Sequence, residues 1–245
     1  MISLIYPIKN RLNLFTVTIA SILKYAINLR DKFEIIVIDS GSQDAIEPFC
    51  EVLRHFLDIS YVEYAYPGLP GRHNPAYALN LGARLAKYKS IVFSSPEILH
   101  QTDVIQQLLP LVGKNVTCHV DNLNEDGSFH MELVSPKFRA HDPGMYFIGM
   151  FNKDDFWKID GIDEQFMRGE TWEDSDLGER FLRAGLKHEF HNEIVGKHQF
   201  HQRVHRSDKS WSVNKAHYEN NRRNSVIHVN DGVVPGDPKY IVKKL

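Results

Sequence analysis

Residues 34–44 read EIIVIDSGSQD, and this stretch decides the fold. Four β-branched apolar residues follow one another at 35–38, and the run stops at an acid, Asp39, and a turn that contains Gly41. A continuous apolar run of this length is typical of a strand that is buried on both faces, as in the centre of a parallel sheet. In such sheets ligands bind beyond the carboxyl ends of the strands, so Asp39 stands where a ligand would be met.

Strand and helix patterns alternate on both sides of this run. An apolar strand at residues 2–6 stops at Pro7, and another short strand at residues 91–93 leads into a polar turn at 94–96. Strands that alternate with helices at this spacing indicate βαβ units and a largely parallel sheet. The other segments predicted for this part are helices at 13–29, 45–57 and 75–88 and a strand at 61–66.

The pattern changes near residue 115, where a smaller β/α portion begins. Residues 115–120 and 129–134 form a predicted hairpin, and a clear helix is predicted over 173–184. Weaker helical patterns lie at 152–160 and 208–223. We therefore expect an α/β fold, in which a mostly parallel sheet is flanked by helices and a second, smaller region follows it.

The composition is that of an ordinary globular chain with no strong overall charge. Apolar residues make up 42% of the 245, and 29 basic residues nearly cancel 31 acidic ones. A chain of this length buries a substantial core, and its charge balance offers no field that would recruit nucleic acid. Two cysteines, Cys50 and Cys118, are too few for a disulfide scaffold and favour a reducing compartment.

The targeting signals that a sequence can carry are not evident in this one. The N-terminal apolar stretch is too short for a signal peptide, and no stretch approaches the ~20 apolar residues that cross a bilayer. We therefore expect a cytoplasmic protein without a transmembrane segment. A peripheral contact with a membrane surface stays open.

Several motifs in a fixed order give the chain a resemblance to a known family. They are VIDSGSQD at 37–44, ALNLGARLA at 78–86, DGIDEQF at 160–166, WEDSDLGERFLRAG at 172–185 and HQFH at 198–201. Over about residues 2 to 201 the chain resembles the family 2 glycosyltransferases, which have a GT-A fold. The resemblance implies metal-assisted transfer of a sugar from a nucleotide-sugar that is commonly UDP-linked, by a hexosyl- or hexosaminyltransferase.

The resemblance also implies one GT-A domain over residues 1–245, built on a Rossmann-like sheet. Residues 1–114 would form the nucleotide-sugar-binding half, and residues 115–201 would form the acceptor-binding and catalytic half. The tail at 202–245 is rich in Arg, Lys and Asn, and its basic residues are candidates for a lid over the diphosphate. They are Arg203, Arg206, Lys209, Arg222 and Arg223. A solvated charged face is the alternative.

Five residues are assigned to the nucleotide-sugar by the resemblance, and one of them, Ser95, also belongs to the predicted metal motif. Pro7 and Arg72 would lie near the uridine and the diphosphate, and Arg72 would pair with phosphate oxygens unless it is a solvated loop residue. Asp39 can accept hydrogen bonds from a base N–H or a ribose hydroxyl, and its alternative is an Asx-turn closed with Ser42. Asn80, in an Asn-x-Gly pattern, is open to a structural or a ligand-binding role.

Many GT-A enzymes hold a divalent cation with an Asp-x-Asp motif. The corresponding strand end here reads Ser95-Pro96-Glu97, so Glu97 keeps the second acid while Ser95 replaces the first and can contact ribose or a metal-bound water. A histidine after a later strand completes the metal site in several branches of the fold. This makes His198 the first and His201 the second candidate ligand for Mn²⁺ or Mg²⁺. The alternative is that Ser95 caps a helix that begins near Pro96.

An inverting transfer needs one carboxylate to take the proton of the attacking hydroxyl. The family pattern makes Asp174 this base and Glu173 the residue that orients the acceptor or the donor sugar. The alternative is a capping box with Thr171, in which Asp174 hydrogen-bonds to the backbone. Asp176 either faces solvent or pairs with Arg180 four residues later.

Three further residues are assigned to the acceptor. Trp172 would stack on a sugar ring, unless it is an ordinary buried tryptophan. Gly149 and Met150 would line the acceptor side by resemblance. The acceptor is a carbohydrate, a lipid-linked compound or another hydroxyl compound. Neither the sugar, nor the linkage, nor the oligomeric state follows from the sequence.

Two rival functions stay open. The reduced Asp-x-Asp motif also fits a catalytically inactive module that binds nucleotide-sugars. A nucleotidyltransferase shares a similar first strand and a metal, but it needs a glycine-rich loop after that strand, and residues 7–11 contain no glycine.

Overall fold

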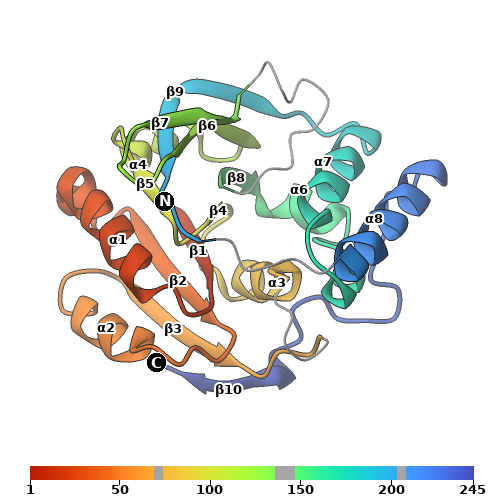
Figure 1. The fold of residues 1–245 in the computed structure, drawn as a ribbon, viewed down its shortest axis with the longest axis horizontal. Coiled ribbons are helices and arrows are strands. Elements are labelled where there is room, and N and C mark those ends of the chain that lie inside the picture. The colour runs from red at the N-terminus through yellow and green to blue at the C-terminus, as the bar shows by residue number, and fades with distance from the viewer. Residues whose placement is uncertain (69–73, 136–146, 203–207) are drawn as a thin grey trace.

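A computed structural model describes residues 1–68, 74–135, 147–202 and 208–245. Within them one ten-stranded sheet has the order β10-β3-β2-β1-β4-β8-β6-β9-β5, and β7 pairs with β6 off this path (Figure 1). The strands are β1 (Ile2–Ile8), β2 (Phe33–Asp39), β3 (Ile59–Tyr64), β4 (Ser90–Ser94), β5 (Ile98–His100), β6 (Val116–Leu123), β7 (Phe129–Val134), β8 (Ile148–Asn152), β9 (Glu189–His198) and β10 (Ile241–Lys244).

Four parallel strands, β3, β2, β1 and β4, form one block of this sheet. The chain steps outward from β1 to β2 to β3 and then returns to place β4 on the other side of β1. Where the winding direction reverses in this way, a crevice opens beyond the carboxyl ends of the two neighbouring strands. Here that crevice lies beyond Ile8 of β1 and Ser94 of β4.

β1 is buried because helices cover both faces of the sheet, and its side chains alternate between the two layers. Leu4 and Tyr6 belong to the core beneath α1 and α2, whereas Ile5 belongs to the core beneath α3, α6 and α7 (Figure 1). The helices are α1 (Leu12–Ala26), α2 (Ile46–Leu53), α3 (Ala76–Leu85), α4 (Val104–Leu108), α6 (Lys153–Lys158), α7 (Glu173–Arg183) and α8 (Asp208–Arg223). Short 3₁₀ segments are η1 (Ile27–Leu29), η2 (Leu109–Leu111), η3 (Glu164–Arg168) and η4 (Pro238–Tyr240).

The predicted α/β fold, a sheet flanked by helices, is confirmed, and β6 and β7 form the predicted hairpin. The second half of the chain adds mixed pairing to the parallel block. β8 runs antiparallel to both β4 and β6, and β9 runs parallel to β6. One continuous sheet therefore passes through both predicted halves.

The described part of the C-terminal tail packs on the domain, and its role as a lid stays a prediction. α8 lies against α7 and η3, and β10 pairs antiparallel with β3. Arg222, one of the predicted lid cations, has its Nε 3.4 Å from Glu179 Oε1 of α7. Arg203 and Arg206 lie outside the described residues.

After β4 the chain turns and starts another strand, so the predicted alternative of a helix cap at Ser95 is wrong. The amide of Ile98 donates to the carbonyl of Ser95 at 3.2 Å and closes a turn over Pro96 and Glu97. Proline suits the second position of such a turn because its φ is already fixed near about −65°. β5 follows at once and pairs antiparallel with β9.

The stretch Leu12–Leu29, which is α1 followed by η1, is long and apolar enough to cross a membrane by length and composition alone. This finding differs from the prediction that no segment is long and apolar enough to cross a membrane. In the structure Phe15, Ile19 and Ile22 of α1 are buried against the sheet, as in a helix that covers a globular core.

His100 ends β5 and is buried without a partner for one ring nitrogen. Its backbone amide donates to Ser21 Oγ at 2.9 Å, but its Nε2 has no hydrogen-bond partner among the described residues. Burial lowers the pKa of His100 from 6.5 to about 4. The folded protein therefore keeps this ring neutral at pH values where the unfolded chain protonates it.

We expect the free energy of unfolding to fall as the pH is lowered from about 7.5 to about 5. In this range the unfolded chain protonates His100, whereas the folded protein keeps it neutral. His100→Leu should remove about 2 kcal/mol of this loss. Urea unfolding at both pH values measures the effect, with the exposed His130→Gln as control. An unchanged pH dependence in His100→Leu would contradict the assignment.

Candidate active site

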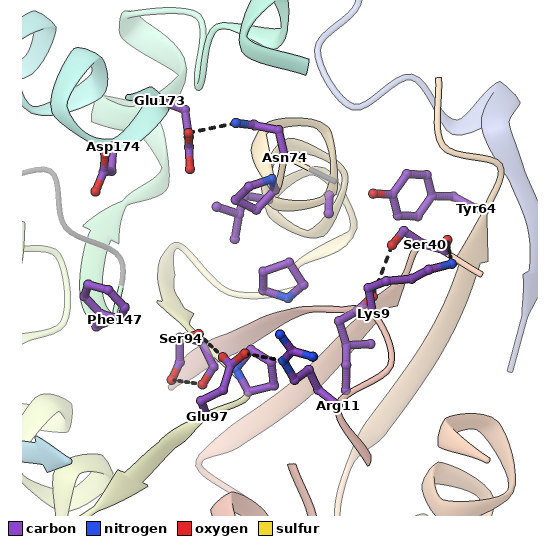
Figure 2. A pocket seen from close by; sticks show the side chains of 17 residues that line it. Lys9, Arg11, Ser40, Tyr64, Asn74, Ser94, Glu97, Phe147, Glu173 and Asp174 are labelled. Carbon is purple, nitrogen blue, oxygen red and sulfur yellow. Dashed lines mark hydrogen bonds and ion pairs between the residues drawn. The ribbon is translucent and has the colours of Figure 1, made fainter. Parts of the chain in front are cut away.

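A cavity of about 290 Å³ opens at the crevice beyond β1 and β4 (Figure 2). Strand ends form one side of it, and the starts of α3 and α7 form the other. The polar and charged side chains in its lining are Lys9, Arg11, Ser40, Tyr64, Asn74, Ser94, Ser95, Glu97, Glu173 and Asp174. A cavity at a switch point of an α/β sheet is the expected place for a small-molecule ligand.

Two cations from the segment after β1 lie on the strand side of the cavity. Lys9 Nζ donates to the carbonyl of Ser40 at 2.9 Å. Arg11 Nε donates to Glu97 Oε1 at 3.0 Å, and Ser95 Oγ donates to Oε2 of the same carboxylate. Both oxygens of Glu97 are therefore engaged, and the carboxylate holds the Arg11 guanidinium at the cavity.

The acid pair Glu173 and Asp174 opens α7 on the opposite side of the cavity (Figure 2). Glu173 is buried, and its Oε2 accepts a hydrogen bond of 2.8 Å from Asn74 Nδ2. Asn74 Oδ1 in turn accepts from the amide of Ala76 at 3.0 Å, so the same side chain starts α3 and holds Glu173. Asp174 Oδ1 accepts from the amide of Ser175 at 2.8 Å, and Asp174 lines the cavity.

The chain enters α7 through two residues in the left-handed region, Thr171 at φ 65° and Trp172 at φ 76°. This conformation costs about 1 kcal/mol or more for each residue with a side chain, so the turn depends on outside contacts. Asn214 Nδ2 of α8 donates to the carbonyls of Thr171 at 2.9 Å and Phe166 at 2.8 Å. The ring of Trp172 stacks on Tyr218 of α8 with 4.9 Å between centroids. The tail thus fixes the turn that presents the acid pair.

The predicted alternative of a capping box at this helix start is wrong. Thr171 Oγ1 donates to the carbonyl of Glu170 at 2.6 Å. The N-cap residue is Trp172, which makes no side-chain capping bond. Asp174 is therefore not the acidic partner of Thr171 in a capping box.

α7 is anchored by Arg180, whose guanidinium is 0% exposed. Its Nε donates to Asp176 Oδ2 at 2.6 Å, and its Nη1 and Nη2 donate to the carbonyls of Ile159 and Gly161 at 2.8 Å each. The pairing of Asp176 with Arg180 is thus confirmed, and both side chains lie in the interior rather than in solvent.

The same network continues from α7 into α8. Asn221 Nδ2 donates to Asp176 Oδ1 at 3.0 Å and to Asp163 Oδ2 at 3.2 Å, and His217 Nε2 lies 2.7 Å from Asp163 Oδ2. Burial acts to raise the pKa of Asp163, but hydrogen bonds from His217 and a backbone amide outweigh it and lower that pKa. The side chains of Asp163 and Asp176 therefore join α7, α8 and the loop before η3.

The structure brings several of the predicted site residues together. Those that line the cavity are Pro7, Ser95, Glu97, Glu173 and Asp174. They come from β1, from the turn after β4 and from the start of α7, which are far apart in the sequence. Arg72 lies outside the described residues.

Asp39 and Asn80 lie outside the lining and use their polar atoms within the protein. Asp39 Oδ1 accepts from the amide and the hydroxyl of Ser42 at 2.8 and 2.7 Å, so the Asx-turn alternative is formed. Tyr61 donates to Oδ2 at 3.0 Å. Asn80 exchanges two hydrogen bonds with the backbone of Ile162, at 2.8 and 2.9 Å. Both residues therefore make structural contacts, and their assignment to the nucleotide-sugar stays a prediction.

The three predicted acceptor residues also lie away from the lining. Gly149 and Met150 sit inside β8, paired with β4, and Met150 is fully buried. Trp172 packs its ring against α8 rather than toward the cavity lining. The residue just before β8, Phe147, lines the cavity instead.

Within the part of the chain that the structure describes, the residues around Glu97 do not fit a resident divalent cation. His201 is the nearer histidine, with Nε2 3.9 Å from Glu97 Oε1, whereas His198 packs its ring on Phe147 at 5.5 Å. Among the described residues no three acids, histidines or cysteines form a group that could hold a metal. An ion about 2.1 Å from Glu97 Oε1 would lie beside the Arg11 guanidinium, which already neutralises that carboxylate.

The lining includes residues that the sequence did not assign to a site. They are Ile8, Lys9, Arg11, Ser40, Tyr64, Asn74, Pro75, Ala78, Leu79, Ser94, Pro96 and Phe147. Lys9 and Arg11 directly follow the first predicted strand, so the strand-end rule that selected Asp39 also selects them. Asn74 and Phe147 carry no such signal, because only the packing of α3 and β8 brings them to the cavity.

Solved structures share this fold and define the class of protein. A mannosyltransferase of Pyrobaculum calidifontis, solved with GDP-Man and Mn²⁺, matches with a TM-score of 0.60 and 17% identity over 89% of this chain and 61% of its own. S. aureus TarS residues 1–349, solved with UDP-GlcNAc, match with a TM-score of 0.64 and 13% identity over 83% and 60%. The fold is that of the GT-A glycosyltransferases.

The particular family follows from the sequence match. The chain belongs to glycosyl transferase family 2, whose model matches residues 3–167. An uncharacterized glycosyltransferase of Rickettsia conorii is 32% identical over 144 residues, which are 57% of this chain and 22% of that protein. A Rickettsia felis relative is 31% identical over the same shares. The chain thus spans about a fifth of the length of these curated relatives.

Arg180→Met should lower the free energy of unfolding by about 3–5 kcal/mol, because it leaves the buried Asp176 charge and two carbonyls without their donor. Urea unfolding measures the loss. Lys187→Met, an exposed position four residues past the end of α7, is the matched control and should change it by less than about 0.5 kcal/mol. A loss for Arg180→Met within the range of the control would contradict the anchoring role.

Proposed function

We propose that the chain transfers a sugar from a nucleotide-sugar to a hydroxyl acceptor with inversion at the anomeric carbon, and that Asp174 is the base. The observation that carries this proposal is the layout of the cavity. Asp174 lies on the α7 side, and the cation Arg11 lies on the strand side, across the cavity (Figure 2).

An inverting displacement needs its base and its leaving group on opposite sides of the reacting carbon. With the diphosphate at the strand ends, the sugar carbon lies between Arg11 and Asp174. The acceptor oxygen forms a bond to the anomeric carbon as the bond between that carbon and the oxygen of the diphosphate breaks. The hydroxyl proton passes to Asp174, and a nucleoside diphosphate leaves with the bonding electrons.

Glu173 has a supporting role in this proposal. Its carboxylate is buried and held by Asn74, and it directly precedes Asp174 on the first turn of α7. A fixed carboxylate at this point can accept hydrogen bonds from sugar hydroxyls. Glu173 is therefore the residue that we propose to orient the acceptor or the donor sugar.

The proposal also covers the nucleotide and the sugar of the donor. The similar structures were solved with UDP, UDP-GlcNAc or GDP-Man, and we propose a UDP-linked hexose or hexosamine. The Mn²⁺ of the mannosyltransferase supports the sequence-based idea of a divalent cation, for which Glu97 with His201 or His198 are the candidate ligands. The described residues around Glu97 do not form a set of ligands that fits such an ion. The proposed step therefore does not depend on a metal.

Calorimetry against UDP- and GDP-linked sugars tests the function and separates its rivals. We expect binding of one donor, together with slow hydrolysis of that donor in the absence of acceptor. Binding without hydrolysis or transfer to any acceptor would favour the inactive module. Binding of a nucleoside triphosphate and a sugar phosphate, with release of pyrophosphate, would favour a nucleotidyltransferase. Failure to bind any nucleotide would overturn the proposal.

Asp174→Asn should lower the rate of transfer or donor hydrolysis by about 10²–10⁴-fold, because the amide cannot take the proton. The dissociation constant for the donor should stay within about twofold, because the diphosphate lies at the other side of the cavity. Timed activity assays measure the rate of transfer or hydrolysis, and calorimetry measures the dissociation constant for the donor. Asp231→Asn, an exposed acid in the tail, is the control. A variant that keeps full activity would remove Asp174 as the base.

A further inference from the structure

We infer that Arg11, held in place by Glu97, supplies the positive charge that binds the donor diphosphate, so that the nucleotide-sugar binds without a divalent metal. This inference rests on the proposed function and names how the same site neutralises its substrate. Its basis is an ion pair at the strand end where the family places its metal motif.

The pair occupies the position between the ends of β1 and β4. Arg11 precedes α1, and Glu97 lies in the turn after β4, so the two meet across the switch point. The side chain of Glu97 is 11% exposed and that of Arg11 is 26% exposed, which leaves the cation as the more accessible member. A ligand that enters the crevice therefore meets the guanidinium before the carboxylate.

Arg11 has donors left for a ligand. Its Nε donates to Glu97 at 3.0 Å, and its Nη1 donates to the backbone carbonyl of Asn10 at 3.2 Å. A guanidinium carries five N–H groups, so these two bonds use fewer than half of them. Figure 2 shows its terminal nitrogens pointing into the cavity and away from Glu97. A planar fork of this kind matches two phosphate oxygens.

The local charge is also that of a phosphate site. On the strand side of the lining, Lys9 and Arg11 carry two positive charges and Glu97 carries one negative charge, while Asp39 and Asp44 lie nearby outside the lining. The other two acids of the lining, Glu173 and Asp174, lie across the cavity on α7 (Figure 2). Because Ser95 replaces the acid that would raise the negative charge at this end, the strand side favours an anion rather than a second cation.

A purely structural role for the pair is the alternative, in which it ties α1 to the turn after β4. That tie already exists in the interior, because Thr18 Oγ1 of α1 donates to the carbonyl of Pro96 at 2.8 Å and Thr18 is fully buried. Gln199 Nε2 adds a bond of 3.2 Å to Thr18 Oγ1 from the segment after β9. The partly exposed ion pair is not needed to hold these elements together.

The test is calorimetric binding of UDP, GDP and inorganic pyrophosphate, each in EDTA and in Mn²⁺. We expect the wild type to bind at least one of them in EDTA, with Mn²⁺ changing the dissociation constant by less than about threefold. Arg11→Gln should weaken binding in EDTA by about tenfold to a hundredfold, since it removes charge-assisted bonds. Arg11→Lys should recover part of the loss, because it keeps the charge without the fork. Arg30→Gln, an exposed arginine after η1, is the control.

The double variant Arg11→Gln with Glu97→Gln guards against a loss that comes from misfolding, since it leaves no unpaired carboxylate. Thermal unfolding of each variant shows whether it is folded, and the folded double variant should bind as weakly as Arg11→Gln. Binding that requires Mn²⁺ and is equal in wild type and Arg11→Gln would overturn this inference and leave the proposed function standing. Absence of binding under every condition would overturn both.

Discussion

The candidate active site of this domain depends on one buried cation. Arg180 lies inside α7 with no exposure and binds Asp176 and the carbonyls of Ile159 and Gly161. A buried charge is stable only when paired and hydrogen-bonded, so the helix has one rotation and one depth at which the guanidinium is satisfied. That constraint sets where the first turn of α7, and with it the acid pair, meets the cavity.

The C-terminal tail completes what Arg180 begins. Thr171 and Trp172 enter α7 in a left-handed conformation that L-residues avoid, and α8 stabilises it through Asn214 and Tyr218. Strain of this kind persists where the surroundings over-determine the backbone, and it often marks a functional site. The two sides of the cavity are thus built differently. The strand side follows from the winding of the sheet, and the α7 side is held by side chains of the tail.

The sequence predicted the local patterns well and the roles of polar residues unevenly. The strand at 34–39 and the helix at 173–184 were recognisable because their apolar periodicity is local. Ser95-Pro96-Glu97 fitted both a helix start and a turn, since proline and an acid suit either, and only the pairing of β5 with β9 settles the choice. Asp39 has the strand-end position of a ligand-binding acid, yet Ser42 and Tyr61 occupy its oxygens. Gly149 and Met150 were assigned by resemblance, which does not show that β8 lies inside the sheet.

By itself the sequence determined the α/β class, the family, and the acids Glu97, Glu173 and Asp174 that line the cavity, because apolar periodicity and motif order are written along the chain. Tertiary structure alone decided which partners those acids meet. Arg11 reaches Glu97 across 86 positions, and Asn74 reaches Glu173 across 99. Such contacts depend on how strands are ordered and how helices pack over them, and no local pattern of residues encodes that geometry.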